Sequence, residues 1–157
     1  MSQYELYSKN ILVRKVILPF STVGKNIDFN IKQKLLCIEG KCAAEGYIKP
    51  NSINIISYSS GIINSNNIHF NVSFNCLICN PVEGMTIKCF VKNVTKAGIR
   101  AEIKGKNSPI IIFIARDHHI NHKIFSNIKE NDTISINVVG KRYELNDEFI
   151  SIIGELK

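Results

Sequence analysis

The sequence predicts an α+β fold, with one helix in the first half of the chain and only strands in the second half. Three observations predict it. Apolar residues recur at helical spacing between residues 27 and 38, they alternate with polar residues along most other segments, and a proline interrupts the chain near its middle. The 157 residues suffice for one domain or for two small ones, and either arrangement can bury a core.

In the first half, strands are expected on both sides of the helix. The segment ILVRKVILPF at 11–20 is β-like. The helix follows in 27–38, where Asp28 lies in the first turn and Gly40 stands where a helix would stop. Its apolar face consists of Ile27, Ile31, Leu35 and Ile38. Short β-rich pieces then occupy 45–80, and the last is a long strand. Its buried face is predicted to be Phe70, Val72, Phe74 and Cys76.

The second half of the chain predicts a barrel. The segment NPVEG at 80–84 is interpreted as a domain boundary that divides residues 1–80 from residues 81–157. Five strands are predicted after it, at 85–95, 98–104, 109–115, 133–140 and 147–153. A short irregular or helical piece at 116–129 separates the third strand from the fourth. Five strands in about 75 residues, with a loop in that position, are typical of the five-stranded Greek-key barrel of the OB type.

A basic stripe crosses the first two strands of this predicted barrel. Lysine or arginine recurs at every fourth position, at Lys88, Lys92, Lys96, Arg100 and Lys104. Apolar residues at every second position between them favour two strands and a turn over a helix, so the even positions face outward.

The outward groups suggest nucleic-acid binding, because cations neutralise phosphates and aromatic rings stack on bases. The candidate RNA-binding residues are Lys88, Phe90, Lys92, Arg100, Phe113, Arg116 and His118. The alternative is an ordinary solvated outer face.

Composition narrows the class of protein. The net charge of +7 favours nucleic acid or an acidic partner. No apolar run reaches the length of a membrane span, and the start MSQYELYSKN has no apolar segment of the kind found in secretory signals, so an intracellular protein without membrane contact is expected. Five cysteines, an odd number, then favour reduced thiols over disulfides. High isoleucine and asparagine content is typical of an AT-rich genome.

Two groups of residues could carry metal chemistry. Four thiols, of Cys37, Cys42, Cys76 and Cys79, could bind zinc, but residues three apart on a strand point to opposite faces. The segment RDHHINH offers Asp117, His118, His119 and His122 to a metal-dependent hydrolase, yet the further aspartates that such a site needs are not in a matching context. A polar loop is favoured, and we expect no catalytic residue, metal or cofactor.

Seven segments together resemble the stalk subunit of multisubunit RNA polymerases, the seventh subunit of eukaryotic RNA polymerase II and its archaeal counterpart. They are NIKQKLLCIEGKC, GYI at 46–48, SSGII at 59–63, the strand that enters NPVEG, NVTKAGIRAEI, IFIARDHHI and VVGKRYELNDEFISIIGEL. The resemblance runs nearly end to end. One departure is Arg100, which stands where S1 barrels usually carry an aromatic residue, so Phe90 and Phe113 would supply the stacking.

The resemblance implies a noncatalytic polymerase subunit with an N-terminal tip domain of ribonucleoprotein-like fold and a C-terminal S1-type barrel. The tip would dock on the polymerase core, a smaller stalk partner would bind where the system has one, and the barrel would contact nascent single-stranded RNA. A large DNA virus with its own polymerase or an AT-rich eukaryote would be its source. It would act in the nucleus or cytoplasm of the host cell and be packaged in the virion if viral.

The resemblance places the core contact at Ser60, Gly61, Ile62 and Ile63. Two isoleucines at the end of a connecting segment have no role in a solvated loop, so they could form an apolar wedge. The alternative is that Ile62 and Ile63 begin the next strand and pack inside. A second functional hypothesis, a free-standing S1 or OB-type single-stranded RNA-binding protein of translation or RNA decay, explains residues 81–157 but gives the first 80 no role.

Overall fold

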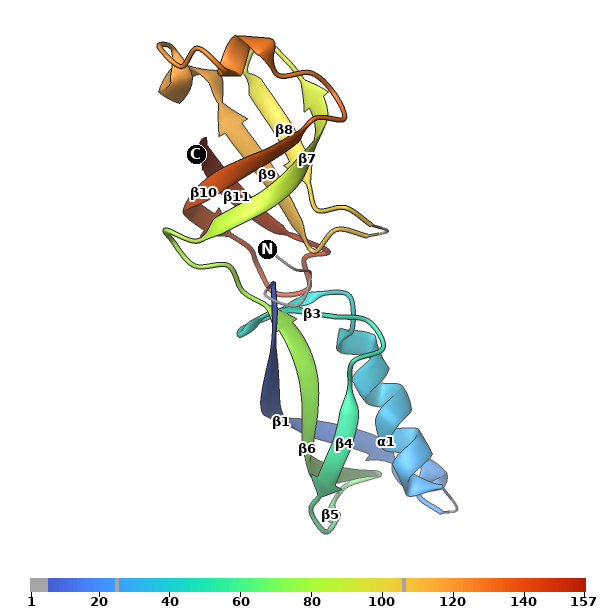
Figure 1. The fold of residues 1–157 in the computed structure, drawn as a ribbon. Coiled ribbons are helices and arrows are strands. Elements are labelled where there is room, and N and C mark those ends of the chain that lie inside the picture. Colours follow the sequence, from blue (N-terminus) through green and yellow to red (C-terminus); the bar gives the residue numbers. More distant parts are fainter. Residues whose placement is uncertain (1–5, 25, 106) are drawn as a thin grey trace.

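The computed structural model describes residues 6–24, 26–105 and 107–157. Within these residues the fold is mostly β, with a single α-helix and a closed five-stranded barrel. Figure 1 shows an elongated molecule, in which a sheet flanked by the helix forms one end and the barrel forms the other.

The N-terminal sheet is built around strand β6 (Asn67–Cys79). Strand β1 (Tyr7–Pro19) pairs with it antiparallel along its whole length, from Tyr7 opposite Cys79 to Pro19 opposite Asn67. Four short strands complete the sheet: β2 (Cys42–Ala43), β3 (Gly46–Ile48), β4 (Asn54–Tyr58) and β5 (Ile62–Asn64). Strands β3, β4 and β5 each pair with β6, so this one strand sets the register of the sheet.

One face of the sheet packs against helix α1 (Ile27–Leu35). The helix buries Ile31 and Leu35, and Asp28 and Lys32 near its two ends complement the helix dipole. A 3-10 turn (Leu36–Ile38) continues it to Gly40, whose φ of +71° is a left-handed conformation that glycine adopts without strain. The predicted helix is therefore confirmed. The buried face of β6 is the predicted one: Phe70, Val72, Phe74 and Cys76.

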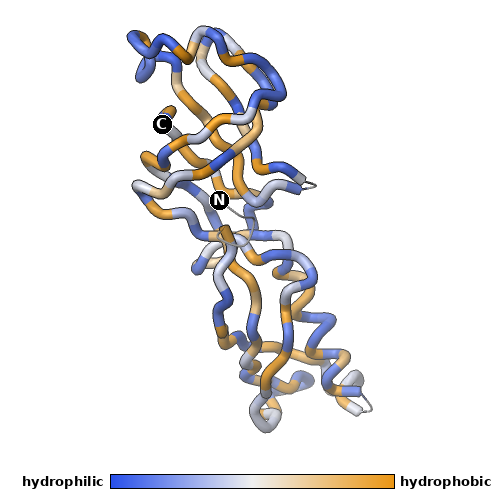
Figure 2. The backbone as a smooth tube through the Cα atoms, in the orientation of Figure 1, coloured by the Kyte–Doolittle hydropathy of each residue, from blue (hydrophilic) through white to orange (hydrophobic). Residues whose placement is uncertain are grey.

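The barrel consists of β7 (Thr86–Val94), β8 (Gly98–Glu102), β9 (Ile110–Ala115), β10 (Thr133–Arg142) and β11 (Ile150–Leu156). It closes in the order β10-β11-β9-β8-β7, and β11 runs parallel to β9. These five strands confirm the predicted barrel and fit an OB-like architecture. Alternating residues fill its interior, and twelve apolar side chains on these strands are at most 2% exposed: Ile87, Cys89, Val91, Ile99, Ala101, Ile110, Ile112, Ile114, Ile136, Val138, Ile150 and Ile152. Figure 2 shows this alternation along the tube.

The irregular segment between β9 and β10 closes one end of the barrel. It contains two 3-10 turns, Arg116–His119 and Phe125–Asn127, as the sequence predicts for 116–129. His119 is 5% exposed, and its ring stacks on Phe125 at 5.3 Å between centroids. Its Nε2 accepts a hydrogen bond from the Leu156 backbone N–H at 3.0 Å, which ties this segment to the last strand.

The other end of the barrel contacts the N-terminal sheet through the loop between β10 and β11. The backbone N–H of Cys42 donates to Asp147 O at 2.7 Å, and the N–H of Asn146 donates to Cys42 O at 2.8 Å. The hydroxyl of Tyr143 donates to Ala44 O at 3.0 Å. The side chains of Cys42, Tyr47 and Cys79 belong to the same apolar cluster as the barrel core. Packing and backbone bonds thus fix the two ends of the molecule to each other.

We predict that Gly98→Ala will lower the free energy of unfolding by about 2 kcal/mol or more. A Cβ at Gly98 would overlap the carbonyl oxygen of Ile114 and would lie 3.1 Å from Cζ of Phe113. Chemical denaturation measures the change. Gly140→Ala is the matched control in the same barrel, because no atom lies within 4 Å of the added Cβ, and it should change stability by about 0.5 kcal/mol or less. Equal losses in both variants would contradict the close approach at Gly98.

Candidate nucleic-acid interface

Three of the predicted RNA-binding residues form one group on the outer face of the barrel. Arg100 on β8 lies directly opposite Phe113 on β9 and opposite Asn93 on β7. Lys92 precedes Asn93 at a bulge in β7, and a bulge increases the local twist of a strand. Lys92, Arg100 and Phe113 are all exposed, as the sequence predicts for positions that face away from the core.

Electrostatics leave the Arg100 guanidinium accessible. Its nearest carboxylate is Glu102, at 3.6 Å, and the Arg100 side chain keeps 53% of its surface exposed. The pair is long and its guanidinium is exposed, so it contributes little to stability and the guanidinium can exchange this carboxylate for a phosphate.

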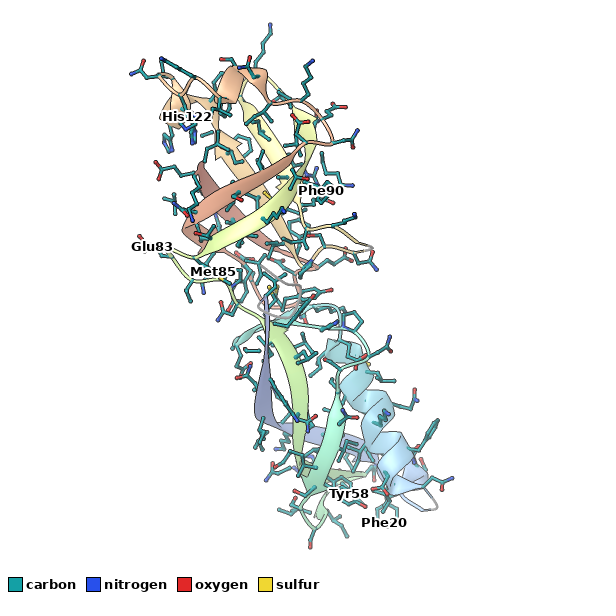
Figure 3. The ribbon with its side chains drawn as sticks, viewed as in Figure 1. Phe20, Tyr58, Glu83, Met85, Phe90 and His122 are labelled. Atoms are coloured by element: carbon teal, nitrogen blue, oxygen red, sulfur yellow. The ribbon has the colours of Figure 1, made fainter. Side chains whose placement is uncertain are left out.

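Phe90 was expected to offer a free surface for stacking, but its ring is already partly occupied. It is half-buried on β7, and the Lys104 ammonium lies over its ring at 5.4 Å from the centroid. Figure 3 shows where Phe90 projects from the barrel. A cation over an aromatic face is an attractive contact, which a base would have to displace before stacking there. Lys88 is exposed on the same strand, opposite Ser135 of β10.

Arg116 supports the turn between β7 and β8. Its Nε donates to Lys96 O at 3.0 Å, its guanidinium donates to Thr95 O at 3.1 Å, and its backbone N–H donates to Ala97 O at 3.1 Å. The guanidinium carbon also lies 5.1 Å from the centroid of the Phe125 ring. The sequence contains no signal for these bonds, because they join residues about twenty positions apart. His118, the neighbouring candidate, is exposed on the 3-10 turn after β9.

His119, one of three histidines in the segment 116–122, has a structural role. The Leu156 N–H can only donate, so Nε2 of His119 accepts and carries no proton, and Nδ1 therefore donates to Ala115 O at 2.7 Å. Both ring nitrogens are occupied by backbone groups, which leaves His119 neither a free ligand nor a free base. In residues 6–24, 26–105 and 107–157, no three His, Cys, Asp or Glu side chains lie close enough together to hold a metal ion.

The cysteines are distributed over different environments. Cys76 packs in the apolar cluster of the N-terminal sheet and Cys79 in that of the barrel, as expected for residues that point to opposite faces of a strand. Burial raises the pKa of the Cys79 and Cys89 thiols to about 12 and that of Cys42 to about 11. Cys37 is exposed on the 3-10 turn that follows α1.

The second predicted site lies at the far end of the sheet, on β5 (Figure 1). Ile62 and Ile63 are 66% and 67% exposed, although both pair with β6. They begin a strand, as one alternative held, but they do not pack inside. Adjacent strand residues point to opposite faces, so neither face of β5 is covered. Figure 3 shows two further exposed aromatic residues, Phe20 and Tyr58, at this end of the molecule.

Gly61 allows the chain to approach the core closely just before β5. A Cβ there would lie 2.5 Å from Cγ2 of Ile68 and 3.0 Å from a ring carbon of Phe70. Ser60 beside it is exposed. A hollow of about 380 Å³ lies next to β5 and is lined by Lys15, Ile62, Ile63, Asn64, His69 and Asn71.

None of the described helices is long and apolar enough to cross a membrane.

Comparison with known proteins found a viral relative that matches nearly the whole chain. The chain is 29% identical over 174 residues to a protein of Acanthamoeba polyphaga mimivirus that bears the name "Putative DNA-directed RNA polymerase subunit". The similarity covers 99% of this chain and 84% of the viral protein, so it includes both the N-terminal sheet and the barrel. No protein-family model matches the sequence.

The thiols provide a test of the cysteine environments. At about pH 8, a disulfide reagent such as dithionitrobenzoate should react quickly only with Cys37, because the reactive species is the thiolate. Cys42, Cys76, Cys79 and Cys89 are buried and their thiol pKa values are raised. They should react only after denaturant unfolds the chain. Absorbance counts the thiols, Cys37→Ser should abolish the fast phase, and fast reaction of a second thiol in that variant would contradict the described packing.

Proposed function

We propose that this protein is a noncatalytic stalk subunit of a DNA-directed RNA polymerase. The observation that carries the proposal is the similarity, over nearly the whole chain, to a viral protein named as a polymerase subunit. That similarity supports the role of polymerase subunit, and therefore association with other polymerase subunits. The stalk position is the finer part of the proposal, and it is supported by the order of a helix-flanked sheet followed by an OB-like barrel.

Each half of the chain receives a role in this proposal. Residues 1–80 are the tip domain, with a ribonucleoprotein-like fold, which docks on the polymerase core. Residues 81–157 are an S1-type barrel that contacts nascent single-stranded RNA. A smaller stalk partner binds where the system has one, and the protein acts wherever its polymerase transcribes in the host cell. In this proposal catalysis takes place in the polymerase core. His119 agrees with that role, because both of its ring nitrogens form hydrogen bonds with backbone groups.

The RNA contact is proposed for the outer barrel face that carries the predicted residues. Exposed cations on neighbouring strands can follow a phosphate backbone, and an exposed aromatic ring among them can stack on a base. The face comprises Lys88, Phe90, Lys92, Arg100, Phe113, Arg116 and His118. Its contacts are mainly with phosphate, so binding should depend steeply on salt and only slightly on sequence.

The first test removes two phosphate contacts. Lys88→Ala with Lys92→Ala should lower the slope of log affinity against log salt by roughly 0.7 per lost contact. A phosphate that the protein no longer contacts keeps its counterion, so fewer counterions are released on binding. Fluorescence anisotropy with a labelled single-stranded RNA measures the slope. The matched control is Lys9→Ala with Lys15→Ala, which removes the same charge from exposed positions on β1 and should leave the slope unchanged. An unchanged slope in the first variant would remove Lys88 and Lys92 from the site.

The docking contact is proposed for Ile62 and Ile63, with Ser60 and Gly61 before them. Two isoleucines, each about two-thirds exposed on a strand with no covered face, offer apolar surface that binding would bury. An apolar anchor of this kind commonly contributes about 2 kcal/mol or more, roughly thirtyfold in affinity.

Ile62→Asp with Ile63→Asp should therefore release the tagged subunit from the polymerase core in pull-down experiments from the native host system. The variant should still fold, because neither side chain belongs to a core cluster. Ile120→Asp with Ile124→Asp is the control, since these isoleucines are 78% and 61% exposed on the barrel. Core subunits recovered at wild-type levels with the first variant would place the docking site elsewhere.

A free-standing S1 or OB-type single-stranded RNA-binding protein is the second candidate, favoured by the closed five-stranded barrel considered alone. The same pull-down, followed by mass spectrometry, separates the two. Polymerase core subunits in the purified complex support the stalk role, whereas ribosomal or RNA-decay proteins in their place support the alternative.

A further inference from the structure

We propose that RNA crosses the outer face of β7, β8 and β9, where one base stacks on Phe113, and that the β10–β11 loop takes no part in binding. The inference rests on the proposed RNA contact of the barrel. It goes further by choosing Phe113 over Phe90 as the aromatic platform and by excluding a loop that OB barrels commonly use together with the loop between their first two strands.

The β10–β11 loop is hydrogen-bonded to the N-terminal sheet. Two backbone hydrogen bonds join it to Cys42, from Asn146 at 2.8 Å and to Asp147 at 2.7 Å, and Tyr143 bonds to Ala44 at 3.0 Å. RNA could displace these groups only by breaking the contact between barrel and sheet. The loop therefore serves as a structural contact, and the barrel keeps the opposite turn for a ligand.

Charge separates the same two regions. The stretch 92–100, which includes the β7–β8 turn, contains three cations and no carboxylate: Lys92, Lys96 and Arg100. The stretch 143–149 contains three carboxylates and no cation: Glu144, Asp147 and Glu148. Glu148 also lines, together with Glu102, a hollow of about 510 Å³ between the barrel and the sheet. Lys141 and Arg142 precede this second stretch, and Arg142 lies 3.9 Å from Glu144, so a polyanion is attracted to the first region more strongly than to the second.

Phe113 provides the stacking surface within the basic region. The residue is 42% exposed, and it lies between Arg100 on β8 and Ile153 on β11, which is 48% exposed. Cζ of Phe113 would be 3.1 Å from a Cβ at Gly98, so the ring lies close over a residue without a side chain. This row of guanidinium, aromatic ring and aliphatic side chain can hold a phosphate, a base and a sugar in turn. Phe90, with Lys104 over its ring, instead positions a cation.

The test uses the full-length protein and a labelled oligouridylate, with anisotropy as the measurement. Phe113→Ala should weaken binding roughly fivefold or more, the lower limit of what stacking of one base on an aromatic ring contributes. Phe113→Leu keeps apolar volume near Gly98 and should show the same loss, which covers the case in which the alanine variant folds poorly. Phe113→Tyr keeps the ring and should retain wild-type affinity.

The matched control is Phe149→Ala. Phe149 is 39% exposed, almost as much as Phe113, but it belongs to the β10–β11 loop. Its variant should bind like the wild type. If Phe149→Ala weakens binding as much as Phe113→Leu, the β10–β11 loop does take part in binding and this proposal is wrong, although the barrel still contacts RNA. If the wild-type protein fails to bind the oligouridylate at low salt, the RNA contact itself is wrong.

Discussion

The parallel pairing of β9 with β11 is the interaction on which the rest of the structure depends. It joins Ile110 through Phe113 to Ile150 through Ile153 and closes five strands into a barrel. Parallel neighbours cannot be joined by a tight turn, so the chain must travel through the irregular segment and β10 before it returns. That detour produces the two features that define the barrel's ends: the segment with His119, which holds Leu156, and the β10–β11 loop, which holds Cys42. Closure also removes edge strands and fixes which side chains face outward.

The outward face and the sheet contact are therefore products of one topology. Isoleucines on alternate positions fill the barrel and leave the other positions to carry charge or aromatic rings. At one end, Arg116 occupies the carbonyl groups of the β7–β8 turn, so the turn is held in place while its cations stay available. At the other end, the acidic loop is joined to the sheet. A polymerase subunit that contacts RNA with one end and protein with the other would need this separation.

Local patterns predicted the strands and the helix because each has one face in a core and one in solvent, which is a property of neighbouring residues in sequence. The burial of Ile87, Cys89 and Val91 beside exposed Lys88 and Lys92 follows directly from that alternation. The bonds of Arg116 to Thr95 and Lys96 and the cation over Phe90 could not be predicted, since they depend on how separate strands meet. For Ile62 and Ile63 the sequence left two alternatives, and strand formation and exposure turned out to coexist, because β5 pairs with β6 while both of its isoleucines stay exposed. The roles of these residues remain predictions.

The bonds between Cys42 and the β10–β11 loop also have a mechanical consequence. A body attached to another at a single point can turn about three axes, whereas a second attachment leaves only rotation about the line through both points. The chain enters the barrel through residues 80–85, and the loop provides the second attachment at Cys42. The Lys141 ammonium, bonded to the Asn80 side chain, and the shared packing of Tyr47 and Cys79 resist the remaining rotation. The sheet and the barrel thus form one rigid unit. A protein that bound β5 at one end would therefore also set the orientation of the barrel at the other.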